Sequence, residues 1–263
     1  MRSIFISVLS FLIIGCDSKQ NGFLNEEKKI EGLQESVEIL RDQWGINHIY
    51  ANNQKDLFFA QGYAAAKDRL FQFEIWRRQA TGTVAEILGP DELARDIGTR
   101  LFQFRGDLNT ELSHYHPEGK AIIESYVAGV NSYIKEVLKT PEELPLPFKI
   151  LAIQPKLWTP EVVISRHQGL LGNIGQELQI GRAVSLLGPK KVKELLWFHP
   201  QEPYINLDKK IDSKLLFEDI LAPYFAFRKP VHFKSEHLKK DYQKKGAMAI
   251  LDRYNDLSRD SLA

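Results

Sequence analysis

After the N-terminal stretch, hydrophobic residues gather in two short runs, at residues 37–40 and 46–50. The stretch Arg41-Asp42-Gln43-Trp44-Gly45 separates the runs, and it is mostly polar with a glycine at its end. Two short apolar runs around such a break are typical of a β-hairpin. The sequence therefore predicts that the patterned part of the chain begins with two short strands.

The spacing of apolar residues then becomes helical. Asn53, with Asp56 three residues later, predicts a helix start, because a side-chain oxygen can cap free N–H groups and a carboxylate is favoured near the positive end of the helix dipole. The helix is expected to reach about Ala80, with Gly82 as its stop. Its apolar residues cover more than one stripe, which predicts that the helix is largely buried.

Charged residues interrupt this apolar helix at two places. Glu74 and Arg78 stand four positions apart with the acid first, which is the favourable orientation for an intrahelical pair. Asp68 and Arg69 lie in the middle of the helix between apolar positions. We expect these two to be buried, paired and structural in role, because an unpaired buried charge is costly.

Two more helices are predicted downstream. Pro90 opens a short helix that runs to about Arg100, and Pro117 opens a longer one in which apolar residues recur at helical spacing as far as Ile134. Several prolines then fall within residues 141–155 and predict an extended connector.

A last long helix is predicted to begin at Thr159, with Pro160 in its first position. Gly169, Gly172 and Gly175 interrupt it. Because glycine costs about 1 kcal/mol relative to alanine inside a helix, we expect a break into two pieces here. Close packing against a neighbouring helix is an alternative reason for the glycines.

The first sixteen residues have the form of an export signal. A single positive charge at Arg2 precedes an apolar run, residues 4–14, that is too short to span a bilayer. Residues 13–16 resemble a bacterial lipobox, in which Cys16 would be lipidated and become the mature N-terminus. A simple cleaved signal is the alternative, but Cys16 is the only cysteine in the chain and stands where the lipobox requires one.

Residues 17–35 are polar and charged, and they predict a tether between a lipid anchor and the folded part. The expected location is the cell envelope, on the periplasmic side if the cell is Gram-negative. A net charge of +1, with acids and bases interspersed, gives no electrostatic case for nucleic acid. With one cysteine no intramolecular disulfide can form, so packing must hold the fold.

Four blocks of sequence carry a resemblance more specific than any single motif. They read RDQWGINHIYA (41–51), AQGYAAAKDRLFQFEIWRRQATGTVAEILG (60–89), ESYVAGVNSYI (124–134) and KLWTP (156–160). In this order they resemble the α-subunit region of the penicillin acylase, or penicillin amidase, family of N-terminal-nucleophile hydrolases. The resemblance covers residues 36–233, and it departs from the family pattern at Asn47, often proline there, and at Lys67, often glutamine.

The resemblance implies an α+β fold class: a mostly helical α-subunit portion of a four-layer αββα sandwich. It also implies that residues 234–263 are the start of a truncated spacer. Residues 234–245 carry mixed charges and predict a solvated segment.

Site residues follow from the same resemblance. Asn173 and Ile174 match positions that shape the acyl pocket in the family, although their chemistry differs from the arginine and aromatic found in penicillin G acylases. Glu177 matches a carboxylate that contributes to a calcium site, and one carboxylate cannot form such a site alone. The alternative is that Glu177 pairs with Arg182 or faces solvent.

Other reactive side chains give weaker signals. His167 has no identifiable carboxylate partner, and His114 with His116 is expected to mark a surface turn. The serines show no Gly-x-Ser-x-Gly elbow. In the resembling family the nucleophile is the first residue of the β-subunit, usually serine, whose own α-amino group serves as the base.

The function implied is hydrolysis of a linear amide, such as the acyl side chain of a β-lactam or an acyl-homoserine lactone. The partner implied is a missing β-subunit or its separate gene product, so the chain alone is expected to be inactive. Without that partner, the apolar helix at 54–80 is expected to expose a large patch. The alternatives are a non-catalytic envelope lipoprotein and a decayed gene fragment.

Overall fold

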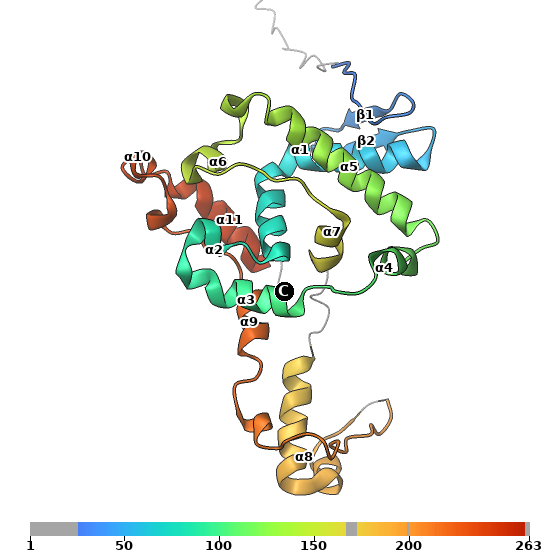
Figure 1. Cartoon of the computed structure of the whole chain (residues 1–263), viewed down its shortest axis with the longest axis vertical. Helices are drawn as coiled ribbons and strands as arrows, with labels where there is room; N and C mark the ends of the chain where they lie inside the picture. Colours follow the sequence, from blue (N-terminus) through green and yellow to red (C-terminus); the bar gives the residue numbers. More distant parts are fainter. Residues whose placement is uncertain (1–25, 167–172, 199, 261–263) are drawn as a thin grey trace, which may run out of the picture. The chain divides into compact units, whose positions relative to one another are not determined.

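The computed structural model describes residues 26–166, 173–198 and 200–260. Residues 31–263 cluster as one compact unit, and the fold described below is that unit. Helices dominate it, with one two-stranded sheet (Figure 1). Its elements are, in order, β1 Glu38–Arg41, β2 Asn47–Tyr50, α1 Gln54–Thr81, α2 Ala85–Leu88, α3 Leu93–Phe102, α4 Leu108–His114, α5 Gly119–Val137, α6 Leu146–Leu151, α7 Pro160–Arg166, α8 Ile174–Leu195, α9 Ala222–Arg228, α10 Lys240–Gln243 and α11 Met248–Asp260.

The predicted hairpin is confirmed. Strands β1 and β2 pair antiparallel, and the Asp42 carboxylate organises their turn by accepting hydrogen bonds from the N–H groups of Trp44 and Ile46, both at 2.9 Å. The Ile46 N–H is the largest of the interactions that lower the pKa of Asp42. Gly45 takes a φ of +81°, a conformation that glycine adopts without strain.

Both predicted ends of the long helix α1 are confirmed. The Asn53 side chain accepts from the Asp56 N–H at 2.8 Å, and Gly82 closes the helix in the left-handed conformation. The buried Asp56 carboxylate also accepts from the N–H groups of Gln34 and Glu35, both at 2.9 Å, and so ties the preceding segment to the start of the helix.

One feature of α1 was not predicted. At Arg69 the backbone leaves helical geometry, with φ −136° and ψ 33°, and the helix is kinked. Residues 63–81 contain neither proline nor glycine, the usual causes of a kink. We find no local cause for the kink in the sequence.

Glycines allow α1 and α5 to cross with their backbones in contact. A Cβ atom at Gly62 would lie 2.1 Å from the carbonyl oxygen of Tyr126, and one at Gly129 would lie 1.9 Å from the carbonyl oxygen of Phe59. No real Cβ atom is found so close to another heavy atom. The crossing therefore depends on having no side chain at either position.

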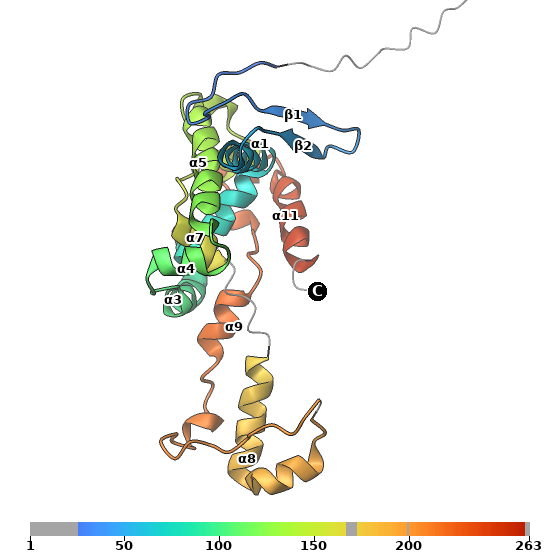
Figure 2. The ribbon, with the colours of Figure 1, turned by 90° about the vertical axis from the view of Figure 1, so that its right-hand side faces the viewer.

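The apolar surface of α1 is covered. Figures 1 and 2 both show α1 between α5 on one side and α11 on the other. The ring of Phe71, for example, packs on those of Phe148, Phe233 and Tyr254, with centroids 5.5, 5.7 and 4.7 Å away. No large apolar residue of α1 is among the exposed ones in the described part of the chain, so the expectation of a large exposed patch at 54–80 is wrong.

Two further expectations about segments outside the long helices are corrected. The proline-rich connector is not simply extended, because it contains α6, which buries Phe148, Ile150 and Leu151 in the core. The segment 234–245 is not simply solvated: Leu238 is 3% exposed and joins the same core, and the Lys239 N–H donates to the Ile150 carbonyl at 2.9 Å.

The mid-helix charges are also placed differently from the expectation. Asp68 and Arg69 are exposed rather than buried. Asp68 does have partners, because its carboxylate accepts from the Arg41 guanidinium and, at 2.9 Å, from the Asn47 amide. These contacts join α1 to the hairpin. The prediction of burial was wrong because no other element covers α1 at residues 67–69 in the described part of the chain.

Candidate functional site

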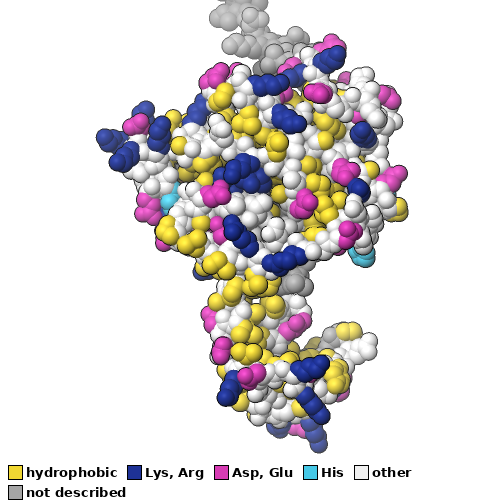
Figure 3. Space-filling model, viewed as in Figure 1, with side chains coloured by type: hydrophobic (Ala, Val, Ile, Leu, Met, Phe, Trp, Pro, Cys, Tyr) yellow, Lys and Arg dark blue, Asp and Glu magenta, His cyan; other side chains and the backbone are white. Residues whose placement is uncertain are grey.

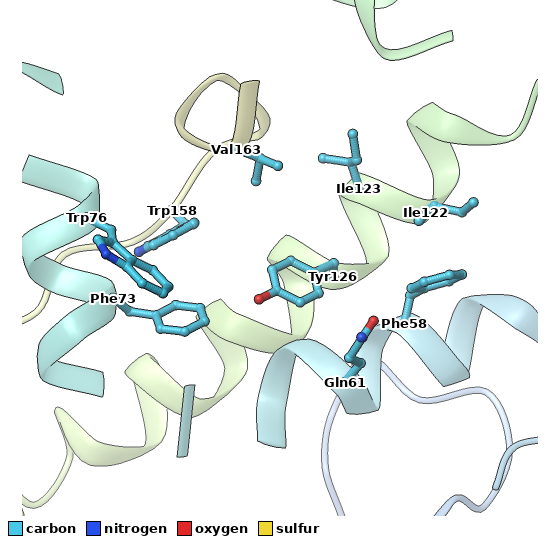
Figure 4. Close-up of a pocket in the computed structure, with 9 residues that line it drawn as sticks. All are labelled: Phe58, Gln61, Phe73, Trp76, Ile122, Ile123, Tyr126, Trp158 and Val163. Atoms are coloured by element: carbon cyan, nitrogen blue, oxygen red, sulfur yellow. The ribbon is translucent and has the colours of Figure 1, made fainter. Parts of the chain in front are cut away.

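A cavity of about 380 Å³ opens between α1, α5 and α7 (Figure 4). Phe58 and Gln61 precede the kink at Arg69, and Phe73 and Trp76 follow it. The two pairs form opposite walls of the cavity. Nearly all lining side chains are apolar or aromatic. They are Phe58, Gln61, Phe73 and Trp76 from α1, Ile122, Ile123 and Tyr126 from α5, Trp158 from the connector and Val163 from α7.

Trp158 is held in the cavity wall by its backbone. The Asn131 side chain of α5 accepts from the Trp158 N–H at 2.8 Å and donates to the Trp158 carbonyl at 2.9 Å. The indole ring packs on Phe73 with centroids 4.9 Å apart. Its Nε1 atom is buried and has no hydrogen-bond partner in the described structure.

A buried carboxylate holds Lys156, two residues before this tryptophan. Glu74 accepts hydrogen bonds from Arg77 Nε and Nη2, at 3.0 and 2.7 Å, and from the backbone N–H of Lys156 at 3.0 Å. Arg78 Nε lies 2.8 Å from the same carboxylate but is not aligned for a hydrogen bond. The connector is therefore fixed to α1 through Glu74 and to α5 through Asn131.

Few polar groups line the cavity. Its polar side-chain groups are the Gln61 amide and the Tyr126 hydroxyl. Burial raises the pKa of Tyr126, so its phenol stays protonated at neutral pH and cannot act as a base. The lining residues include no serine, cysteine, threonine or histidine.

The three residues expected to form the acyl pocket and the calcium site lie together at the start of α8. The Asn173 side-chain amide donates to the Glu177 carboxylate, and the Glu177 N–H donates to the Asn173 carbonyl at 3.0 Å. Ile174 is half-buried beside them. None of the three lines the cavity described above, so the structure holds two separate candidate regions.

Glu177 is exposed, as one alternative had it. The other alternative, a pair with Arg182, is wrong, because that guanidinium donates to the carbonyls of Leu216 and Glu218. No group of three or more His, Cys, Asp or Glu side chains suited to a metal exists in residues 26–166, 173–198 and 200–260. Glu177 is therefore not part of such a group among the described residues, and its calcium role stays a prediction.

The remaining candidates fall mostly outside the site. Helix α7 comprises Pro160–Arg166 and α8 begins at Ile174, but the expected break, with His167, Gly169 and Gly172, lies outside the described residues and stays a prediction. Cys16 also lies outside them. His114 and His116 are exposed around the end of α4, as expected of a surface turn. Within the described segments no helix is both long enough and apolar enough to span a membrane.

Comparison with known proteins gives consistent matches. The family model for penicillin amidase matches residues 36–235. The chain is 37% identical over 144 residues to penicillin G acylase of Escherichia coli, covering 54% of this chain and 17% of the relative. It is 30% identical over 202 residues to penicillin acylase 2 proenzyme of Pseudomonas sp. (strain SE83), covering 76% and 26%. Acyl-homoserine lactone acylase QuiP of Pseudomonas aeruginosa is 30% identical over 182 residues, covering 68% and 21%.

The solved structure of a thermostable penicillin G acylase from Alcaligenes faecalis is similar, with a TM-score of 0.52 and 28% identity. The match covers 66% of this chain and 97% of the matched chain, so the matched region is nearly a whole chain in that structure. By contrast, this chain spans about a quarter or less of the length of the curated relatives above.

Proposed function

The chain belongs to the penicillin amidase family, and from this premise we propose that it is the α-subunit part of an amidohydrolase that cleaves a linear amide into a carboxylate and an amine. The observation that carries the proposal is the match over residues 36–235, which corresponds to almost an entire separate chain of a solved acylase. The relatives named for penicillins and for acyl-homoserine lactones both act as acylases, so an acyl amide is the proposed substrate class.

In this proposal the nucleophile comes from a second polypeptide, the β-part. The cavity lined by Trp158 and Tyr126 offers hydrogen-bonding groups but no nucleophile, which supports a separate source. The hairpin supports a partner as well. A two-stranded sheet is marginal alone in water. Leu40 in β1 and Trp44 and Ile46 in the turn are 49%, 80% and 58% exposed. Strands of a β-part adjoining β1 or β2 would complete the proposed four-layer αββα fold.

Asn173, Ile174 and Glu177 keep their proposed roles at the start of α8. Asn173 and Ile174 would face the acyl group. Glu177 fits one ligand of a calcium ion, because it is exposed and Asn173 occupies only one of its oxygens in the described hydrogen bonds. The other oxygen ligands would come from the β-part. Because Asn173 differs from the arginine of penicillin G acylases, we propose no single acyl group.

The chain alone is expected to hydrolyse no amide. The segment from residue 17 onward would be purified by itself and together with the polypeptide encoded downstream, begun at its serine nucleophile, and assayed with phenylacetyl amides and acyl-homoserine lactones. Turnover should appear only with both polypeptides, because an N-terminal nucleophile and its α-amino base act as one unit.

Two controls make this experiment decisive. Replacing the β-part serine with alanine should preserve the complex and abolish turnover. Hydrolysis by the isolated chain above a matched blank would show that it holds a nucleophile of its own. Absence of a downstream reading frame with such a serine would instead favour the rival proposal, a non-catalytic envelope lipoprotein or a decayed gene fragment.

We also propose that Cys16 is lipidated and anchors the protein in the cell envelope. The support is its position directly after the apolar run of residues 4–14. Metabolic labelling with a fatty-acid probe should label the natural protein and not a Cys16→Ser variant. Equal labelling of both proteins would refute the anchor without affecting the enzymatic proposal.

A further inference from the structure

Helix α3 presents its polar residues to the interior and its apolar residues to solvent. Arg95, Asp96 and Thr99 are 4%, 6% and 6% exposed. On the opposite side, Leu93, Ile97 and Leu101 are 52%, 63% and 53% exposed. These three stand four residues apart, so they form one stripe along the helix, which we call the α3 stripe. This arrangement is the reverse of that in an ordinary surface helix.

The buried polar residues fix α3 in this orientation. The Arg95 guanidinium donates to the carbonyls of Lys229 and, at 2.9 Å, Pro230, which follow the end of α9. The Asp96 carboxylate accepts from the N–H groups of Val84, at 3.0 Å, and Ala85, at 2.8 Å, where α2 begins. Rolling the helix to bury the α3 stripe would break all these bonds to α2 and to the segment after α9, and Arg95 would keep only its pair with Glu92 in the same turn of α3. The backbone N–H and carbonyl groups that α3 now satisfies would lose their partners, which is costly.

Close packing on α9 blocks the same rotation. A Cβ atom at Gly98 would lie 2.2 Å from the Pro223 carbonyl oxygen, so the backbones of α3 and α9 are in contact at that point. Phe102 packs on Tyr224 and Phe227, with ring centroids 5.6 and 5.3 Å apart. Only a surface from outside the described residues can therefore cover the α3 stripe.

The size of the α3 stripe indicates which kind of surface that is. A helix of ten residues is about 15 Å long, so one of its faces offers on the order of 200 Å². A stable interface between two copies needs about 800 Å² from each partner. The α3 stripe is too small for such a dimer by itself, but it suits one contact within a larger interface.

A larger interface is what the relatives imply. The chain covers 26% of the Pseudomonas proenzyme, and its counterpart in the Alcaligenes acylase is nearly a complete chain. Roughly three quarters of such a relative thus lies outside the matched region and offers a surface large enough to cover it. Figure 3 shows hydrophobic side chains gathered at the lower edge of the helical core, where Figure 1 places α3.

We propose that the α3 stripe is a docking surface for the β-part, which would place an apolar helix or sheet face against Leu93, Ile97 and Leu101. The inference rests on the proposed function, because it takes the catalytic polypeptide as the partner. It adds that binding depends on the outward side of α3, which carries none of the predicted pocket or metal residues.

The test compares binding of the downstream polypeptide to the natural chain and to an Ile97→Lys variant. Because Ile97 is 63% exposed, this variant should fold normally, which circular dichroism will check. We expect its affinity for the β-part to be at least tenfold weaker, because a lysine ammonium would have to be desolvated in an apolar contact. An Ile97→Leu variant should bind like the natural chain. Leu146→Lys, the same kind of exchange at a 43% exposed residue of α6, should also leave binding unchanged.

The outcomes separate the inference from the proposed function. If the natural chain binds the β-part and Ile97→Lys binds it equally well, the α3 stripe is not a docking surface, while the proposed function stands. If the natural chain neither binds the β-part nor yields turnover with it, the proposed function fails and the inference fails with it. If sedimentation shows a dimer of the natural chain that Ile97→Lys dissociates, with β-part binding unchanged, the α3 stripe contacts a second copy and the inference is overturned.

Discussion

Replacing Gly129 with alanine is expected to lower the stability of the fold by about 3 kcal/mol or more. The added Cβ atom would lie 1.9 Å from the carbonyl oxygen of Phe59 and 2.9 Å from the N atom of Tyr63. These are backbone atoms of α1, so no side-chain movement can relieve the clash. Helices α1 and α5 would have to move apart. Overpacking lowers the free energy of unfolding by about 1–3 kcal/mol when side chains can adjust. Because only backbone atoms are involved here, we expect a loss at the upper end of that range or above it.

Thermal unfolding followed by circular dichroism measures this effect. For a chain of this size, 3 kcal/mol corresponds to a fall in Tm of roughly 6–12 °C. Gly181→Ala is the matched control, because Gly181 lies within α8 and a Cβ atom there would meet its nearest neighbours at 3.7 and 3.8 Å, which is ordinary contact. That control should be neutral or stabilise by up to about 1 kcal/mol. Equal Tm values for Gly129→Ala and the natural chain would show that α1 and α5 do not touch as described.

Replacing Glu74 with alanine should cost about 3–5 kcal/mol, the range for removing one partner of a buried ion pair. The Glu74 side chain is 0% exposed, and those of Arg77 and Arg78 are 7% and 5% exposed. Its removal leaves charge on two buried guanidinium groups without their shared anion. It also frees the Lys156 N–H, which holds the connector beside the cavity. Urea unfolding of the purified chain would measure the change.

Asp68→Ala provides the comparison on the same helix. Asp68 is also an acid paired with an arginine, but its side chain and that of Arg41 are 28% and 51% exposed. Exposed ion pairs contribute about 0–1 kcal/mol, so the loss should be no larger than that. Similar losses for Glu74→Ala and Asp68→Ala would mean that burial does not control the strength of these pairs in this fold.

Local signals in the sequence predicted where elements begin and end. Asn53 and Gly82 act within one helical turn of themselves, through a side-chain cap and a left-handed closing residue, so their roles can be derived without knowing the rest of the fold. The hairpin around Asp42 is local for the same reason. The Glu74–Arg78 pair was predicted from spacing alone, but its burial and its bond to Lys156 depend on a segment 82 residues away.

Features set by distant contacts could not be predicted in this way. The kink at Arg69 has no cause in the neighbouring residues, and the burial of Leu238 requires a core that earlier parts of the chain supply. The reversed polarity of α3 can be recognised only once the partners of Arg95, just after α9, and of Asp96, at the start of α2, are known. Helical periodicity identifies two faces, but it does not say which one is buried when polar residues find buried partners.

The candidate site shows the same division. The KLWTP block at residues 156–160 was identified as one of the four blocks that carry the family resemblance. Nothing in its sequence indicated that Asn131 would hold Trp158 in a cavity wall. The signal that could have found the cavity is the accumulation of aromatic residues at 58, 73, 76, 126 and 158. Their convergence needs the crossing of α1 and α5 and the kink between the two pairs of α1 residues.

The packing of Phe71 on Phe233 and Tyr254 has a consequence for the time course of biosynthesis. Tyr254 is added to the growing polypeptide about 180 residues after Phe71, which at 5–20 residues per second corresponds to roughly 10–40 seconds. During that interval α1 can meet α5 but lacks its cover on the other side. A nascent chain of this protein therefore carries an unfinished core while these residues are made, and ribosome-bound chaperones would encounter α1 in that state.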